Sequence, residues 1–121
     1  QELISKKLLN SVHDVSSGGI ILALTEMCLK GNIGAKIKVP KSKMSLNEYL
    51  FGEDQSRYII EVSDKNLDEV GQTLDKNGIF YELIGKTQKE SLEIDKEFSE
   101  KLNNLYKLNS FWFKNYFNEI K

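Results

Sequence analysis

Two short segments carry the residue types that could perform chemistry. The first, residues 13–19, reads His-Asp-Val-Ser-Ser-Gly-Gly and runs directly into an apolar stretch. Adjacent glycines let backbone amides approach a ligand, and a helix N-terminus carries a partial positive charge that favours phosphate. Asp14 could cap that helix or bind a hard cation such as magnesium. The alternative is a tight strand-to-helix turn in which Gly18 and Gly19 serve packing alone.

The second segment, residues 51–57, reads Phe-Gly-Glu-Asp-Gln-Ser-Arg. Its polar side chains, above all Glu53, Gln55 and Arg57, suit hydrogen bonding to a polar ligand or to another subunit. A charged loop that only faces water before a strand would contain the same residue types. The spacing of this segment therefore leaves both interpretations open.

The single cysteine and the single histidine exclude several site classes. One cysteine can form neither an intrachain disulfide nor a four-cysteine zinc site. Cys28 lies within an apolar stretch, where a buried structural thiol is the expected role. Cys28 and His13 would lie roughly 20 Å apart at opposite ends of one helix, which rules out a catalytic pair.

The composition indicates one globular domain. The chain has 121 residues, with 17 basic and 18 acidic side chains and a net charge of −1. This balance gives no electrostatic reason to expect a nucleic-acid or membrane partner. No apolar run reaches the roughly 20 residues of a membrane span, and the first residues do not resemble a signal peptide. Because the first residue is Gln rather than Met, we expect the chain to be part of a longer one.

Hydrophobic spacing and turn residues predict the elements that would position the two segments. Helices are predicted over residues 2–9, 20–30 and 66–76, and strands over residues 12–15, 35–39, 58–62, 79–84 and 91–94. Residues 45–50 are predicted to form a short turn or helix that Ser45, with Glu48 three residues later, could cap. Residues 98–120 are predicted to be helical and aromatic-rich, with an interruption near Asn109 and Ser110. The helix over 20–30 is apolar on nearly every face, so we expect it to be buried between other elements. This mixed order predicts a single α+β domain over residues 1–121.

In this order and at this separation, the segments resemble those of the phosphoribosylformylglycinamidine synthase family. The resemblance covers nearly the whole chain, and its most specific part is the run Phe-Gly-Glu-Asp-Gln-Ser-Arg. The other matching stretches are residues 13–19, Ala-Leu-Thr-Glu-Met at 23–27, Asn-Ile-Gly-Ala at 32–35, Ile-Gly-Lys-Thr at 84–87 and Trp-Phe at 112–113.

The resemblance implies a fold and a reaction. The fold would be a layered α/β/α domain with a mixed sheet, like the C-terminal domain of aminoimidazole ribonucleotide synthetase and partly ferredoxin-like. The full enzyme would be a cytoplasmic, ATP- and Mg²⁺-dependent carbon–nitrogen ligase of purine biosynthesis. It would convert formylglycinamide ribonucleotide and glutamine-derived ammonia to the amidine. This chain would be the C-terminal domain of its second half, inactive alone.

The resemblance also implies partners and a site. The partners would be the N-terminal domains of the same chain and, for the small type of synthase, a glutaminase subunit and a small accessory subunit. The catalytic histidine would lie upstream, so His13 is not that residue and no catalytic residue is assigned here. Pseudo-symmetry with the first half implies an auxiliary site that holds no ATP or Mg²⁺ tightly in the isolated chain, with Asp14 as its metal ligand. The implied ligand-binding residues, expected near the start of the helix at 20–30, are Asp14, Gly18, Gly19, Glu53, Gln55 and Arg57.

Two other interpretations stay open. One is another enzyme of the same superfamily, such as selenophosphate synthetase, against which the run at 51–57 argues. The other is a non-enzymatic interaction module that uses the aromatic tail at residues 111–113, 116 and 117. Exposure of these aromatic side chains would indicate an interface, whereas packing on the domain's own sheet would be purely structural.

Overall fold

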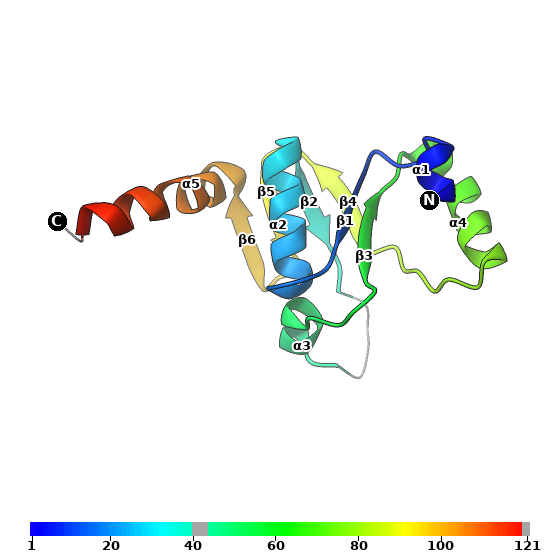
Figure 1. Cartoon of the computed structure of the whole chain (residues 1–121), viewed down its shortest axis with the longest axis horizontal. Coiled ribbons are helices and arrows are strands. Elements are labelled where there is room, and N and C mark those ends of the chain that lie inside the picture. The colour runs from blue at the N-terminus through cyan, green and yellow to red at the C-terminus, as the bar shows by residue number, and fades with distance from the viewer. Residues whose placement is uncertain (40–43, 120–121) are drawn as a thin grey trace. The chain divides into compact units, whose positions relative to one another are not determined.

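The computed structural model describes residues 1–39 and 44–119, and it forms two compact units (Figure 1). One unit contains residues 1–23 and the described part of 42–83, and the other contains the described parts of 24–41 and 84–121. The elements in chain order are α1 (Glu2–Ser5), β1 (Ser11–Asp14), α2 (Gly19–Gly31), β2 (Gly34–Ile37), α3 (Leu46–Phe51), β3 (Tyr58–Glu61), a 3₁₀ turn (Asp64–Asn66), α4 (Leu67–Lys76), β4 (Gly85–Gln88), β5 (Ser91–Ile94), β6 (Phe98–Lys101) and α5 (Leu102–Glu119).

The first unit is built on an antiparallel ladder between β1 and β3, which lie side by side in Figure 1. Its last pair joins Asp14 to Tyr58, and the N–H of Val15 extends the ladder by donating to the Arg57 carbonyl at 2.8 Å. Antiparallel strands bring the end of one strand beside the start of the other. The chain that follows Asp14 and the chain that precedes Tyr58 therefore leave the ladder at the same end.

Helix α3 begins at a capping box, as the sequence predicts. The Ser45 N–H donates to Glu48 Oε2 at 2.7 Å, and the Glu48 N–H donates to Ser45 Oγ at 3.3 Å. These reciprocal bonds satisfy two amides that a helix start otherwise leaves without an acceptor. Tyr49 and Leu50 of this helix are buried.

The second unit contains a four-stranded sheet in the order β4-β2-β5-β6. Strand β2 pairs parallel with β5 and antiparallel with β4, and β5 pairs antiparallel with β6. Leu92 and Ile94 of β5 are fully buried, which marks β5 as the central core strand of this unit. The sheet is mixed, and this confirms the predicted α+β class with a mixed sheet.

Burial of α2 differs from the prediction. Its buried residues are Ile20, Ala23, Leu24 and Cys28, which repeat at spacings of three and four and so form one stripe. Leu22 is 42% exposed, so the expected burial between other elements does not extend to every face of the helix. An apolar composition alone does not show which faces of a helix are covered.

Four further features differ from the sequence predictions. Residues 79–84 form no strand, and β4 begins only at Gly85. Helix α5 is continuous through Asn109 and Ser110, and Ile120 lies outside the described residues. Strand β6 was not predicted, and the first helix ends at Ser5 rather than extending to residue 9. Within the described ranges, no helix is long and apolar enough to cross a membrane.

Candidate functional site

The two polar segments meet at the first residues of α2. The backbone N–H of Gly18 donates to Glu53 Oε1 at 2.7 Å. A carboxylate that accepts a backbone N–H at a helix start makes a charge-assisted bond and complements the helix dipole. The sequence prediction that Glu53 lies near the start of α2 is confirmed.

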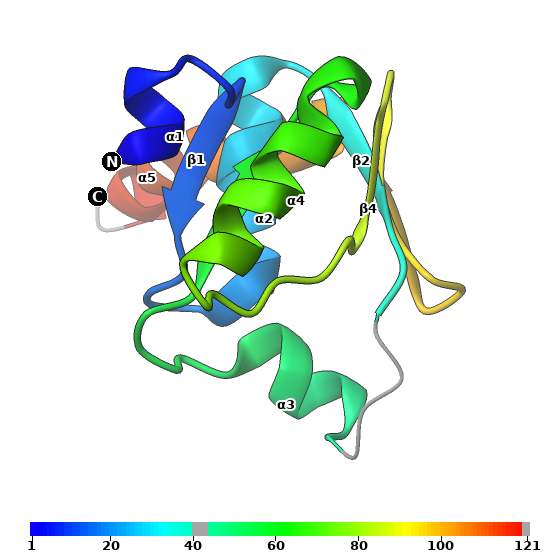
Figure 2. The same ribbon diagram turned by 90° about the vertical axis from the view of Figure 1, so that its right-hand side faces the viewer.

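The occurrence of glycine at positions 18 and 19 has a steric explanation, which at Gly19 involves the neighbouring helix α3. Gly19 has φ +70°, and a Cβ at this position would lie 2.4 Å from the Leu50 carbonyl oxygen. Gly18 has φ +81°, and its Cβ would lie 2.8 Å from Leu22 Cδ2. Figure 2 shows α3 next to the first turn of α2, where this close approach occurs. A side chain on Gly19 would push the two backbones apart, so the position requires glycine.

The amides of both glycines already have acceptors in the protein. The Gly18 N–H binds Glu53, and the Gly19 N–H donates to the Ser16 carbonyl at 3.1 Å. A phosphate that used the Gly18 amide would have to displace the Glu53 carboxylate. The packing interpretation of the glycine pair thus has a direct structural basis.

The Arg57 guanidinium donates hydrogen bonds to acceptors in its own loop and in the adjoining helix α3. Its Nη1 donates to Asp54 Oδ2 at 3.2 Å and to the Gly52 carbonyl at 3.4 Å, and its Nη2 donates to the Tyr49 carbonyl at 3.5 Å. The guanidinium carbon also lies 5.5 Å from the centre of the Tyr49 ring, within reach of a cation–π contact. Arg57 therefore ties the end of α3 to the start of β3.

Tyr49 is the contact of this loop that sequence analysis missed. Burial and the nearby Glu82 carboxylate raise the pKa of the Tyr49 hydroxyl, and Arg57 opposes part of that increase. Tyr49 lies in α3 and Arg57 lies in the loop after it, so no periodic signal within one element linked the two residues.

Asp14 and Gln55 remain the groups open to a ligand. Asp14 ends β1 with an exposed side chain; its carbonyl oxygen lies 2.6 Å from His13 Nδ1, and its Oδ1 lies 3.9 Å from that nitrogen. Gln55 is exposed, and its side chain makes no hydrogen bond to any other described residue. Both side chains lie on segments that the Gly18–Glu53 bond holds together.

The described residues contain no cluster of three or more His, Cys, Asp or Glu side chains that could hold a metal ion. Mg²⁺ commonly takes one or two protein carboxylates and completes its shell with phosphate oxygens and water. Asp14 fits the role of one such carboxylate, but it does not form a complete protein site. Cys28 is buried, as predicted for a structural thiol.

Comparison with known proteins places this arrangement in a family. A model of the family described as AIR synthase related protein, C-terminal domain, matches residues 1–96. The chain belongs to this family. That match runs through both compact units and both polar segments, and it confirms the C-terminal domain type that the motifs predicted.

Two curated relatives of this chain carry the same name. A phosphoribosylformylglycinamidine synthase subunit PurL from Pelagibacter ubique is 42% identical over 115 residues, which is 95% of this chain and 16% of the relative. The PurL of Beijerinckia indica is 33% identical over 118 residues, with 98% of this chain and 16% of the relative covered. The chain thus spans only 16% of the length of these relatives.

Solved structures show the same fold. The structure of T. maritima PurL complexed with ATP matches with a TM-score of 0.73 at 22% identity, over 86% of this chain and 20% of that chain. PurLQS from Thermotoga maritima matches with a TM-score of 0.75 at 20% identity, with the same coverage. At these identities the likeness concerns the fold, and it confirms the mixed α/β class.

Proposed function

We propose that this chain is the C-terminal domain of a phosphoribosylformylglycinamidine synthase. The whole protein would convert formylglycinamide ribonucleotide, ATP and glutamine-derived ammonia to the formylglycinamidine, ADP and phosphate. The observation that carries this proposal is the match of nearly the whole chain to relatives with that name, at up to 42% identity. The run at residues 51–57 supports it, because its acid and arginine build the loop that holds the start of α2.

Residues 1–121 would form one domain of that synthase. One family model runs through both compact units, which supports a single evolutionary and folding unit. Because the chain spans 16% of its relatives, most of the substrate and nucleotide contacts would lie in other domains of the same polypeptide. The isolated chain would therefore be inactive, and the ligase activity would belong to the whole protein.

We assign the six candidate residues to an auxiliary, non-catalytic nucleotide site. Gly18, Gly19, Glu53 and Arg57 would give the site its shape, since each contacts the other segment or its own loop. Asp14 and Gln55 would face the ligand, with Asp14 binding the Mg²⁺ that accompanies ATP. When bound, the ion would neutralise phosphate charge. Contacts from one side only would give weak nucleotide binding in the isolated chain.

The partners follow from the same proposal. The other domains of the polypeptide would be the first partners, and a synthase of the small type would add a glutaminase subunit and a small accessory subunit. The PurLQS assembly of a Thermotoga relative supports such additional subunits. Purine biosynthesis of this kind would place the protein in the cytoplasm.

A turnover assay tests the proposal. The 121-residue chain and the longer polypeptide encoded with its upstream codons would each be given ATP, Mg²⁺, ammonia and formylglycinamide ribonucleotide. The longer polypeptide should form amidine and ADP in equal amounts, and the 121-residue chain should form none above background. Turnover by the short chain, or none by a folded longer polypeptide, would refute the assignment.

A binding experiment tests the auxiliary site separately. Asp14→Asn in the longer polypeptide should weaken Mg²⁺-dependent binding of ADP, measured by equilibrium dialysis. Asp68→Asn is the matched control, because Asp68 is an exposed acid in the first turn of α4, away from both polar segments in the sequence. Equal binding by both variants would remove Asp14 from the site.

A further inference from the structure

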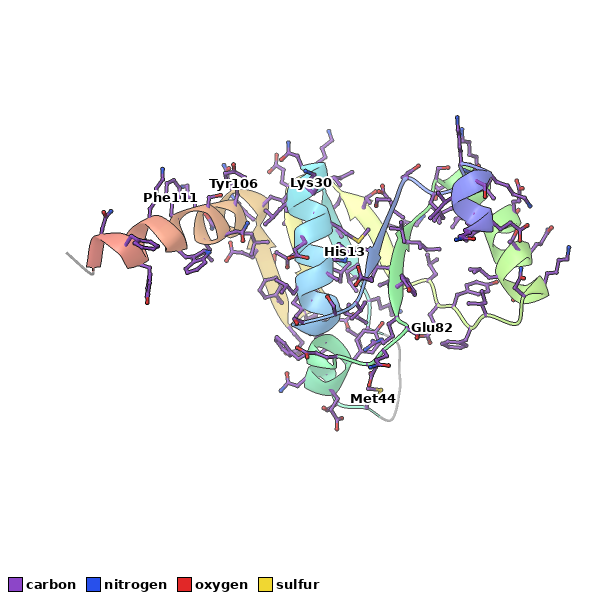
Figure 3. All side chains as sticks on the ribbon, in the orientation of Figure 1. His13, Lys30, Met44, Glu82, Tyr106 and Phe111 are labelled. Carbon is purple, nitrogen blue, oxygen red and sulfur yellow. The ribbon has the colours of Figure 1, made fainter. Side chains whose placement is uncertain are left out.

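Helix α5 carries an exposed apolar face. Leu108, Trp112 and Tyr116 follow one another at spacings of four, which places them on one side of the helix. They are 70%, 59% and 56% exposed. Phe111, three residues after Leu108, borders this stripe and is also exposed, and Figure 3 shows Tyr106 and Phe111 on this helix. We call these four residues (108, 111, 112 and 116) the α5 face.

Two aromatic side chains of the α5 face contact each other, and one of them also contacts Phe117 beside the face. The ring centres of Trp112 and Tyr116 lie 6.5 Å apart, and those of Tyr116 and Phe117 lie 5.8 Å apart in an edge-to-face arrangement. Such contacts limit the rotamers that must be fixed when a partner binds, because the rings already constrain each other. The aromatic residues therefore form a partly ordered contact surface.

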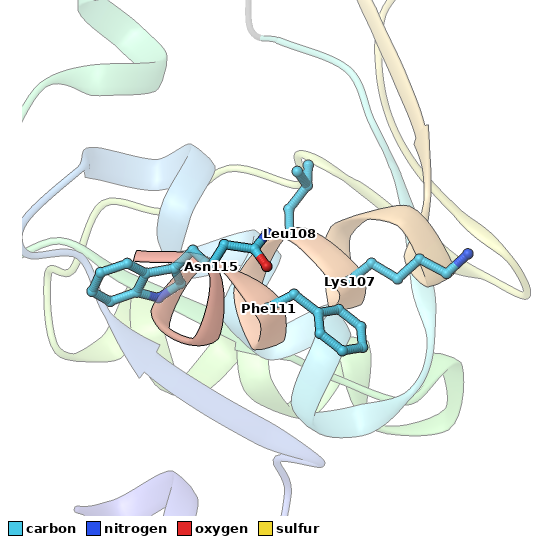
Figure 4. A pocket seen from close by; sticks show the side chains of 5 residues that line it. Lys107, Leu108, Phe111 and Asn115 are labelled. Atoms are coloured by element: carbon cyan, nitrogen blue, oxygen red, sulfur yellow. The ribbon is translucent and has the colours of Figure 1, made fainter. Parts of the chain in front are cut away.

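The two lysines of α5 lie off this face. Lys107 and Lys114 are five residues before and two residues after Trp112, positions that point to the other side of a helix at about 100° per residue. The Lys114 ammonium lies 5.9 Å from the centre of the Phe111 ring. A shallow hollow beside the face is lined by Lys107, Leu108, Phe111, Trp112 and Asn115 (Figure 4).

The size of the α5 face indicates what kind of partner it fits. An aromatic side chain buries about 150–250 Å², so three half-exposed aromatics and one leucine offer roughly 400 Å². A stable complex of separate molecules buries about 800 Å² per partner, which one helix face does not reach. Contacts between domains of one chain bury about 600–1,500 Å² in total, and tethering raises the local concentration of the partner to about millimolar. The face suits a tethered partner better than a second copy of the chain.

The extent of the sequence matches points the same way. The family model ends at residue 96, before α5. The matches to PurL relatives cover 115 and 118 residues of the chain, so they extend well into the region after residue 96. Helix α5 thus belongs to what this chain shares with the long PurL proteins rather than to the general domain family.

We propose that the α5 face packs against the remainder of the same polypeptide, outside residues 1–121, and fixes this domain to it. The proposal rests on the proposed function, because only a longer polypeptide of the PurL kind supplies such a partner. Trp112 is the central anchor, since it is the largest side chain of the face and has exposed neighbours on both sides.

Hydrogen–deuterium exchange of residues 102–119 tests the proposal. Backbone amides of α5 should exchange at least about ten-fold more slowly in the longer polypeptide than in the 121-residue chain. Trp112→Glu in the longer polypeptide should restore the fast exchange. Ser110→Glu is the matched control: it adds the same side chain two residues away, on the other side of the helix, and should keep the slow exchange. In the 121-residue chain both substitutions should leave the melting temperature unchanged, which shows that neither disturbs the fold.

Three results would overturn the proposal. The first is α5 exchange that is the same in both proteins; if the longer polypeptide still makes amidine, the docking fails while the proposed function stands. The second is protection of α5 already present in the 121-residue chain. The third is a concentration-dependent dimer of that chain, seen by sedimentation and by a blue shift of its only tryptophan, which would assign the face to a second copy. Slow exchange in a longer polypeptide without turnover would instead refute the function and leave the docking intact.

Discussion

At the scale of single residues, the motif at 51–57 works mainly within the protein. Glu53 accepts the Gly18 N–H, and Arg57 donates to Gly52, Asp54 and Tyr49. A run of four polar side chains looked from the sequence like a set of ligand-binding groups. Two of them hold backbone in place instead, and they leave Gln55, together with Asp14 on the other segment, open to a ligand.

Removal of the Glu53 carboxylate tests this structural role. Glu53→Ala should lower the free energy of unfolding by about 1 kcal/mol, because the Gly18 N–H at the helix start loses its acceptor. Glu53→Gln should cost less, since the amide oxygen can still accept. Gln55→Ala is the control and should change stability by less than about 0.5 kcal/mol. Urea unfolding measures all three, and an equal loss for Gln55→Ala would show that the loop, rather than the bond to Gly18, determines stability.

Substitution of two glycines that have similar φ angles distinguishes the cost of backbone strain from the cost of steric overlap. Gly19 (φ +70°) would place a Cβ 2.4 Å from the Leu50 oxygen, whereas Gly78 (φ +64°) has nothing within 4 Å of that position. Gly78→Ala should therefore cost only the left-handed backbone strain, about 1 kcal/mol. Gly19→Ala should cost about 3 kcal/mol or more, because α2 and α3 must move apart. Equal costs in urea unfolding would show that Gly19 is needed for its backbone angle alone.

At the scale of elements, capping residues and runs of branched or apolar residues correctly predicted one helix start and two strands. The α3 cap was predicted from Ser45 and Glu48, and β3 and β5 from their branched and apolar residues. Residues 79–84 carry the same kind of apolar residues, yet they form no strand, and Phe80 is 84% exposed. Strand formation depends on a hydrogen-bonding partner that composition does not reveal. Asn109 and Ser110 have low helix propensity, but propensity is a weak signal and α5 continues through them.

The same limit applies to the candidate site. The sequence predicted that the second polar segment lies near the start of α2, and the structure shows that the antiparallel ladder between β1 and β3 brings the two segments together. It did not predict which polar groups bind each other there. That depends on the 2.7 Å contact between Glu53 and Gly18, which joins residues 35 positions apart.

The α3 capping box predicts a pH dependence. Hydrogen bonds from the Ser45 backbone N–H, and then from the Ser45 side chain, lower the pKa of the Glu48 carboxyl from its usual 4.5. A carboxyl with a lower pKa in the folded state stabilises the fold above the unfolded pKa, and this contribution disappears as the pH falls through the folded pKa. The melting temperature of Glu48→Ala should therefore lie below that of the parent chain at neutral pH, and the difference should narrow below pH 4.5. Asn47→Ala, in the same helix, should show no such pH dependence.

At the scale of the whole molecule, α2 links the two compact units through the chain itself. Its residues Gly19–Ala23 belong to one unit, and its remaining residues belong to the other. A hydrogen-bonded helix forms cooperatively, so damage to its core stripe should spread along it. If residues 1–121 are one domain, as we propose, both units should lose stability together when α2 is destabilised.

Leu24→Asp tests this cooperativity, with Leu22→Asp as the matched control. Leu24 is 4% exposed, so an aspartate there would be buried without a partner and should cost about 3 kcal/mol or more. Leu22 lies two residues away on the same helix and is 42% exposed, so its aspartate can reach water and should cost under about 1 kcal/mol. Hydrogen exchange should show the same loss of protection in β3, from one unit, and in β5, from the other, because a single cooperative unit opens as a whole. Loss of protection in β5 alone would mean that the units unfold separately, and the single-domain proposal would then be wrong.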